Sequence, residues 1–255
     1  MAKNSKIEWT HHTFNPWWGC AKVSPGCEHC YAEAFAKRTG NAVWGVGGPR
    51  RFFGEKHWSY PKLWNEESQS EGQRKRVFCA SMADVFEDRE GLRVERRRLV
   101  HLIEATPWLD WLLLTKRPQN IVRLMDEAMD GNFDRMTTFR DRMPNVWLGV
   151  TAEDQNHYDQ RTQWLAHVQA VVRFVSAEPL LGPINLRAWC PDWIIVGGES
   201  GNGARPMKKE WVESIREQCK GVTAFFFKQW GGRLKNAAGR DLDGRTWDEV
   251  PKAGF

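Results

Sequence analysis

Short apolar runs recur along the chain, and each is bounded by polar or turn residues. They lie at 76–82, 108–115, 146–150, 170–176, 193–196 and 224–228. Continuous apolar runs of this length are typical of strands that are buried on both faces of a parallel sheet. One further strand is expected before the first cysteine, within residues 7–14.

Charged stretches of helical length separate most of these runs. They cover residues 88–106, 119–131, 158–166 and 209–220. Strands that alternate with helices predict a parallel α/β fold. We expect a partial (β/α) barrel of the TIM type with about six to seven strands, and an open doubly wound sheet is the alternative. A chain of 255 residues suits a single domain of this kind.

Polar residues follow the predicted strands at the points where they end. In chain order they are Asn15, Ser81, Asp84, Thr115, Lys116, Arg117, Thr151, Glu153, Ser176, Glu178, the segment 197–200, Lys228 and Gln229. The carboxyl ends of parallel strands converge on one edge of the sheet. One such residue alone could merely cap the next helix. Their repetition at six or seven strand ends predicts a shared active site.

Residues 40–60 interrupt the alternation. They are rich in Gly and aromatic residues and contain the adjacent Arg50 and Arg51, which precede Phe52 and Phe53. We expect a long irregular loop over one face of the domain. Its charge and its rings suit contact with a nucleic acid or nucleotide substrate. The alternative is that the two arginines pair with acidic residues and fix a surface loop.

Composition and charge narrow the class of protein. No segment approaches the roughly 18 consecutive apolar residues of a membrane span, and the opening MAKNSKIEWT does not resemble a signal peptide. We therefore expect a soluble, cytoplasmic protein without membrane association. The net charge is +5, with eight Lys or Arg against four Asp or Glu in residues 1–60 and eleven against seven in residues 205–255. Basic ends suit an anionic ligand.

The six cysteines fall into two groups. Cys79, Cys190 and Cys219 each stand alone in an apolar or helical run, and we expect them to be buried small hydrophobic residues. The other three lie within the eleven residues CAKVSPGCEHC, at positions 20, 27 and 30. Disulfides are not expected, because a chain of this length has enough core to fold without them.

Three chemistries fit the closely spaced thiols. Structural zinc takes four ligands, and His29, His11 or His12 could complete the set. A redox pair at Cys27 and Cys30 leaves Cys20 unexplained. A [4Fe-4S] cluster held by three thiolates leaves one iron open, and that position can bind S-adenosylmethionine, the source of a 5′-deoxyadenosyl radical. The Pro-Gly pair before Cys27 permits the sharp turn that such a loop needs.

The motifs of the whole chain resemble one known family. FNPWWGCAKVSPGCEHCYAE, SMADVFED, LLLTKRP, LGVTAED, SAEPLLGPI, GGESGNGARPM and FFFKQWGG are similar to signatures of the phage-associated three-Cys-motif family, a domain of unknown function. That family is itself similar to radical S-adenosylmethionine enzymes, with spore photoproduct lyase as a distant relative. The spacing here is C-x6-C-x2-C, whereas C-x3-C-x2-C is usual in the superfamily.

The resemblance implies roles for the residues of the cysteine motif. Cys20, Cys27 and Cys30 would ligate the cluster. His29 and Tyr31, on either side of the third cysteine, would pack on the adenine of S-adenosylmethionine. An electron donor and a neighbouring partner protein are implied as partners.

The resemblance also assigns the strand ends. Residues expected to hold S-adenosylmethionine are Ser81, Met82 and Asp84 at its amino group, Lys116 or Arg117 at its carboxylate, Thr151 and Glu153 at its ribose, and Gly197 and Gly198 at close backbone approach. The expected catalytic residues on the substrate side are Glu178, Glu199 and Lys228. The alternative for each carboxylate is a structural salt bridge across the strand ends.

These observations favour a radical S-adenosylmethionine enzyme that modifies or repairs a nucleic acid or nucleotide. Three alternatives stay open. The first is a zinc-stapled nucleic-acid-binding module without catalysis. The second is a radical S-adenosylmethionine enzyme that acts on a small metabolite, and the third is an electron-transfer protein. The sequence does not identify the substrate.

Overall fold

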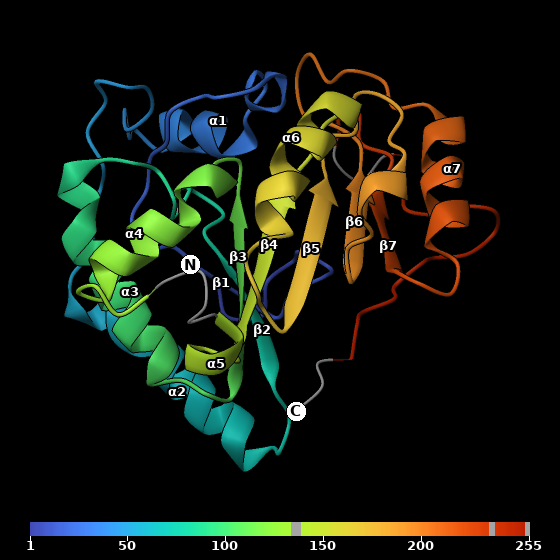
Figure 1. The fold of residues 1–255 in the computed structure, drawn as a ribbon. Coiled ribbons are helices and arrows are strands. Elements are labelled where there is room, and N and C mark those ends of the chain that lie inside the picture. The colour runs from blue at the N-terminus through green and yellow to red at the C-terminus, as the bar shows by residue number, and fades with distance from the viewer. Residues whose placement is uncertain (134–138, 235–237, 253–255) are drawn as a thin grey trace.

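Seven parallel strands form one curled sheet in the computed structural model, which describes residues 1–133, 139–234 and 238–252. The strands pair in chain order, and the sheet curls into a half-barrel (Figure 1). Their bounds are β1 (His12–Phe14), β2 (Lys75–Cys79), β3 (Leu109–Thr115), β4 (Val146–Thr151), β5 (Val172–Ala177), β6 (Trp193–Gly197) and β7 (Ala224–Gln229). The predicted parallel α/β partial barrel is confirmed at this level.

Helices cover the outer face of the sheet, whereas α1 lies at the end toward which the strand arrows point (Figure 1). The helices of the described residues are α1 (Tyr31–Arg38), α2 (Glu55–Ser70), α3 (Arg93–Glu104), α4 (Ile121–Ala128), α5 (Phe139–Arg142), α6 (Gln155–Leu165) and α7 (Lys209–Cys219). The segment that carries the three clustered cysteines leads into α1, so it lies over the carboxyl edge of the sheet. No helix within the described ranges has the length and apolar character needed to cross a membrane.

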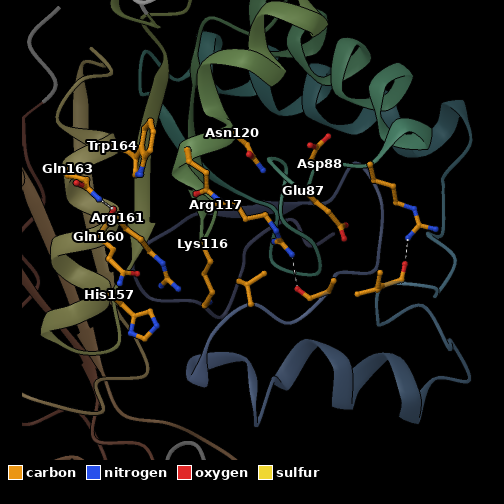
Figure 2. Close-up of a pocket in the computed structure, with 15 residues that line it drawn as sticks. Glu87, Asp88, Lys116, Arg117, Asn120, His157, Gln160, Arg161, Gln163 and Trp164 are labelled. Atoms are coloured by element: carbon orange, nitrogen blue, oxygen red, sulfur yellow. Dashed lines mark hydrogen bonds between the residues drawn. The ribbon is translucent and has the colours of Figure 1, made fainter.

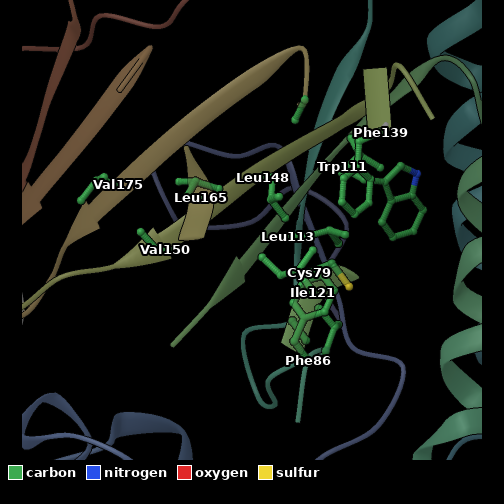
Figure 3. Packing of buried hydrophobic residues seen from close by; sticks show 14 of the residues in the cluster. Cys79, Phe86, Trp111, Leu113, Ile121, Phe139, Leu148, Val150, Leu165 and Val175 are labelled. Carbon is green, nitrogen blue, oxygen red and sulfur yellow. The ribbon is translucent and has the colours of Figure 1, made fainter. Parts of the chain in front are cut away.

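The strands are apolar throughout because both faces of the sheet are buried. On the outer face, Leu148, Val150 and Val175 pack against the helices, in a core that also contains Ile121 and Leu165 (Figure 3). Neighbouring residues point to the opposite face, since side chains alternate along a strand. The two faces together explain the continuous apolar runs in the sequence.

Aromatic rings fill the concave face of the sheet. Trp9 packs on Phe78 with ring centroids 4.6 Å apart, and its ring lies 6.2 Å from that of Trp193. Trp193 in turn contacts Trp147 and Phe226. Several of the chain's tryptophans therefore serve as packing inside the half-barrel, where their large apolar area excludes water.

Two sequence expectations are wrong. Residues 55–60 belong to α2 and not to an irregular loop, because Trp58, Pro61, Trp64 and Ser68 recur at helical spacing and bury one face of that helix. Cys190 is exposed, whereas Cys79 and Cys219 are buried as expected. Cys190 lies just before β6, outside the apolar strand itself.

Candidate active site at the carboxyl edge of the sheet

A cavity of about 320 Å³ lies between the strand ends and the cysteine loop, which we define as residues 20–30. Its floor includes Trp9, Phe78 and Leu114 from the concave face. Most of the predicted site residues line it: Cys20, Cys27, His29, Cys30, Tyr31, Ser81, Asp84, Lys116, Arg117, Thr151, Glu178, Gly198, Glu199 and Lys228. The convergence of the strand ends places them together.

Three predicted cofactor-binding residues do not line this strand-end cavity. The side chain of Met82 packs in a small apolar cluster with Ala32, Ala36 and Val43. Glu153 lies behind the cysteine loop. Gly197 is buried within β6, where a Cβ atom would approach the Glu178 carboxyl at 3.4 Å. Their predicted direct contacts with a cofactor therefore lack support from the geometry.

The thiols of Cys20, Cys27 and Cys30 are free and partly buried, and all three border the strand-end cavity. Burial raises the pKa of Cys20 to about 12, and the charge of Asp84 adds to this effect. Burial also opposes ionisation of Cys27, but the charge of Lys116 and hydrogen bonds to the loop backbone outweigh it and lower the pKa of that thiol. The donor set suits a thiolate-bound metal in kind. Within the described residues, however, no three Cys, His, Asp or Glu side chains are gathered closely enough to hold a metal ion.

The start of the cysteine loop is held by Arg117, at the end of β3. One guanidinium nitrogen, Nη2, donates to the Ala21 carbonyl at 2.7 Å, and Nη1 lies 3.6 Å from the Cys20 sulfur. Nη1 also donates to Asp84 at 2.8 Å. Asp84 accepts further bonds from Thr115 Oγ1 and from the Lys116 amide. Asp84 thus organises the end of β3, and its oxygens are already engaged.

The middle of the loop is held by Glu153, which follows β4. Its Oε1 accepts a hydrogen bond from Ser24 Oγ at 2.5 Å, and its Oε2 accepts from Arg161 of α6 at 2.6 Å. Burial would raise the pKa of Glu153, but the charges of Lys116 and Arg161 outweigh it and lower that pKa. The loop passes so close that a Cβ atom at Gly26 would lie 2.3 Å from Oε1. Glycine is therefore required there.

The end of the loop is held by Glu199, which follows β6. Its Oε2 lies 3.0 Å from His29 Nδ1, and both of its oxygens accept hydrogen bonds from Arg205. Arg205 also donates to the Pro25 carbonyl at 2.9 Å and to Glu28. Although burial opposes ionisation, the bonds from Arg205 lower the pKa of Glu199 to about 2. Glu199 is thus an ionised anchor of the cysteine loop.

Glu178 and Lys228 form an ion pair that faces the strand-end cavity. They follow β5 and end β7 respectively, so strands that are not neighbours supply the two charges. Lys228 is 8% exposed, and the pair does not contact the cysteine loop through any bond in the described part of the chain. These two predicted catalytic residues line the cavity without anchoring the cysteine loop, whereas Glu199 does both.

Gly198 brings the backbone of the β6 end close to that of β7. A Cβ atom at this position would lie 2.0 Å from the Trp230 carbonyl oxygen. The predicted close backbone approach therefore exists, but it is to a neighbouring segment of the chain. Gly198 also borders the cavity.

Arg50 and Arg51 have different surroundings, although the sequence predicted contact with a substrate for both. Arg50 is buried, and its Nε and Nη2 donate to the Glu87 carboxylate at 2.9 and 2.6 Å. Its Nη1 donates to the carbonyls of Val43 and Gly48. The expected contact between Arg50 and a substrate is therefore wrong, since its donors are occupied inside the protein. Arg51 is exposed.

A second, larger pocket of about 740 Å³ lies on the other side of the cysteine loop. Figure 2 shows Lys116 and Arg117 at its centre, with His157, Gln160, Arg161, Gln163 and Trp164 of α6 along one side. Ala21, Val23, Lys116 and Arg117 line both this pocket and the strand-end cavity. These residues therefore separate the two spaces.

Sequence reasoning missed the basic and hydroxyl partners that anchor the loop. These are Ser24, Arg161 and Arg205. Arg205 belongs to the GARPM motif and lies six residues after Glu199. Arg161 lies eight residues after Glu153, in the second turn of α6. Cationic residues at such spacing from a carboxylate are the signal that could have indicated them.

Comparisons with known proteins identify the family but no characterised relative. Searches of curated proteins and of solved structures each found no match. One family model matches residues 4–251, which is almost the whole chain. The chain therefore belongs to the family described as "Protein of unknown function (DUF5131)".

Proposed function

We propose that this protein is a radical S-adenosylmethionine enzyme. The observation that carries the proposal is that three free thiols from one loop border a single cavity at the carboxyl edge of a parallel half-barrel. This edge is where enzymes of parallel α/β barrels place their reactive groups. Three thiolates suit a [4Fe-4S] cluster with one open iron better than they suit a closed zinc site.

The cluster and S-adenosylmethionine would supply a 5′-deoxyadenosyl radical when bound. Cys20, Cys27 and Cys30 would hold the cluster. Lys116, whose Nζ lies 3.4 Å from Thr151 Oγ1, is the cation best placed for the carboxylate of S-adenosylmethionine. Ser81 and the backbone at Gly198 border the same space and offer polar contacts.

The chain's own residues would prepare the site for a reactive species. The aromatic side chains of the concave face exclude water from one side of the cavity, and they leave the reacting groups in an apolar environment. Lys228 Nζ donates a hydrogen bond to the Glu178 carboxylate. This pair could orient a polar substrate group or exchange a proton with it.

The proposal requires a change in the cysteine loop. Because the three thiols are not gathered as metal ligands here, loading with iron must bring them closer together. Before iron binds, the contacts of Arg117, Glu153 and Glu199 hold the loop beside the cavity. Hydrogen exchange of residues 20–30 should therefore slow when iron and sulfide are added.

Anaerobic reconstitution tests the metal directly. The protein should take up about four iron and four sulfide ions per chain and turn brown. Cys20→Ala, Cys27→Ala and Cys30→Ala should each lose this colour. Cys190→Ala is the matched control, because Cys190 is also a free and accessible thiol. A colourless protein with one zinc ion would support the zinc-stapled module and overturn the proposal.

A further inference from the structure

Aromatic rings and arginines form a continuous surface beside the cysteine loop. Trp18 precedes the loop, Phe35 and Arg38 lie on α1 that follows it, and Arg51 and Phe53 come from the glycine-rich segment. We call these five residues the aromatic–arginine surface. None of them lines the strand-end cavity or the pocket of Figure 2.

Most of these side chains contact one another in a chain. The Trp18 ring lies 5.9 Å from those of Phe35 and Phe53, in edge-on geometry. The Arg51 guanidinium sits 5.0 Å from the Trp18 ring and 5.4 Å from the Phe53 ring. Arg38 sits 5.4 Å from Phe35. Ring contacts hold these guanidinium groups in place without neutralising their charge.

The surface remains open to solvent and keeps its positive charge. Phe35 is 38% exposed, and Arg38 and Arg51 are also exposed. In the described part of the chain, neither arginine forms an ion pair with a carboxylate, and Arg51 instead donates to the Asn41 side chain at 3.0 Å. Accessible rings beside unneutralised guanidinium groups suit an anionic ligand that carries flat rings.

We propose that the aromatic–arginine surface binds single-stranded nucleic acid. Exposed rings offer faces on which unpaired bases stack, and guanidinium groups beside them attract the phosphates between those bases. The base faces are stacked inside a double helix, so a duplex would bind this surface through its phosphate charges alone. A protein partner would also pack on the rings. A protein interface is, however, expected to present both acidic and basic groups.

The surface is joined firmly to the candidate active site. Trp18 and Arg51 exchange two backbone hydrogen bonds, at 2.9 and 3.0 Å, and the Gly45 amide donates to the Cys20 carbonyl at 2.9 Å. A strand bound here therefore lies against the segments that enclose the cysteines. The inference names the substrate class of the proposed enzyme and in that respect rests on the proposed function, whereas binding itself needs neither iron nor S-adenosylmethionine.

Fluorescence anisotropy with the metal-free full chain tests the inference. The probes are a labelled 12-nucleotide oligo-dT, an RNA of the same length and a duplex of 12 base pairs. The unaltered protein should bind a single strand more tightly than the duplex. Phe35→Ala should weaken binding by about 5- to 160-fold, since stacking contributes about 1–3 kcal/mol per base.

Substitutions at Arg51 separate charge from general damage. Arg51→Ala should weaken binding and reduce the slope of log affinity against log salt by about 0.7, because one phosphate contact is lost from a single strand. Arg51→Lys should restore the slope. Arg187→Ala removes an exposed arginine from the segment between β5 and β6 and should change neither quantity. Circular dichroism verifies that each variant is folded.

Three outcomes would overturn the inference: no binding by the unaltered protein, equal binding of duplex and single strand, or unchanged binding by both Phe35→Ala and Arg51→Ala. If the protein loads iron normally but binds no oligonucleotide, only the nucleic-acid inference is contradicted. If it binds the oligonucleotide but does not load iron, only the proposed enzyme is contradicted.

Discussion

Arg50 and Arg51 show how much the role of a residue depends on where its side chain points. The backbone of Arg51 pairs with that of Trp18 at the edge of the glycine-rich segment. Arg50 points inward and forms a two-bond contact with Glu87, whereas Arg51 points outward onto two aromatic rings. The first arginine fixes the segment, and the second is free to meet a ligand.

Alanine at each position should therefore reduce stability to very different extents. Arg50→Ala leaves Glu87 buried without its partner, so the free energy of unfolding should fall by about 3–5 kcal/mol. Arg51→Ala removes an exposed side chain and should change that free energy by at most about 1 kcal/mol. Urea unfolding followed by tryptophan fluorescence measures both. Equal losses in the two variants would contradict the assigned geometry.

At the scale of elements, the cysteine loop depends on the strand ends for its position. The loop itself has little regular structure, with one short 3₁₀ turn at Pro25–Cys27. Arg117, Glu153 and Glu199 each bind a different part of it. Several polar residues at the carboxyl edge therefore position the three thiols.

Glu153→Gln tests the middle anchor. The substitution keeps the shape but removes the charge that pairs with buried Arg161, so the free energy of unfolding should fall by roughly 3 kcal/mol. Hydrogen exchange at residues 23–27 should become faster, because Ser24 loses a charged acceptor. Asp159→Asn, at an exposed position on α6, the helix that carries Arg161, is the control and should change neither measurement. Unchanged exchange in Glu153→Gln would exclude an anchoring role.

The start of β1 should make the fold sensitive to acid. Burial lowers the pKa of His11 and of His12 to about 4, and their Nδ1 atoms accept bonds from the Arg76 and Asn4 amides. Both are therefore neutral in the fold at pH 7. As the pH falls from about 6.5 to about 4, the unfolded chain binds more protons than the folded one, and the free energy of unfolding decreases.

Each histidine should contribute a slope of up to about 1.4 kcal/mol per pH unit in that range. Urea unfolding at pH 7, 6 and 5 measures the slope. The double variant His11→Asn, His12→Asn keeps an acceptor at each position and should reduce the pH dependence, whatever its stability at pH 7. A slope that is identical in the variant and the parent would show that other groups cause the acid sensitivity.

At the scale of the whole molecule, the sequence predicted the sheet well because of how it is buried. Strands covered on both faces read as continuous apolar runs, so all seven were located to within a few residues, apart from the start of β1. Parallel order then placed the strand ends together at one edge, where most of the predicted site residues border one cavity. Both results follow from local pattern and topology.

The anchors of the cysteine loop could not be predicted in the same way. Ser24 and Glu153 are 129 positions apart, and His29 and Glu199 are 170 apart, so no local pattern links them. Whether a carboxylate binds a cofactor or a loop depends on which side chains reach it in three dimensions. The burial of Arg50 is a similar case, because its acidic partner comes from the segment that follows β2.

The proposed radical S-adenosylmethionine activity depends on the three clustered cysteines. It is tested by mixing the anaerobically reconstituted protein with S-adenosylmethionine and dithionite and following 5′-deoxyadenosine by liquid chromatography. We expect 5′-deoxyadenosine to accumulate with the parent protein and with Cys190→Ala, but not with Cys27→Ala. Intact S-adenosylmethionine in the presence of fully iron-loaded parent protein would contradict the proposed activity.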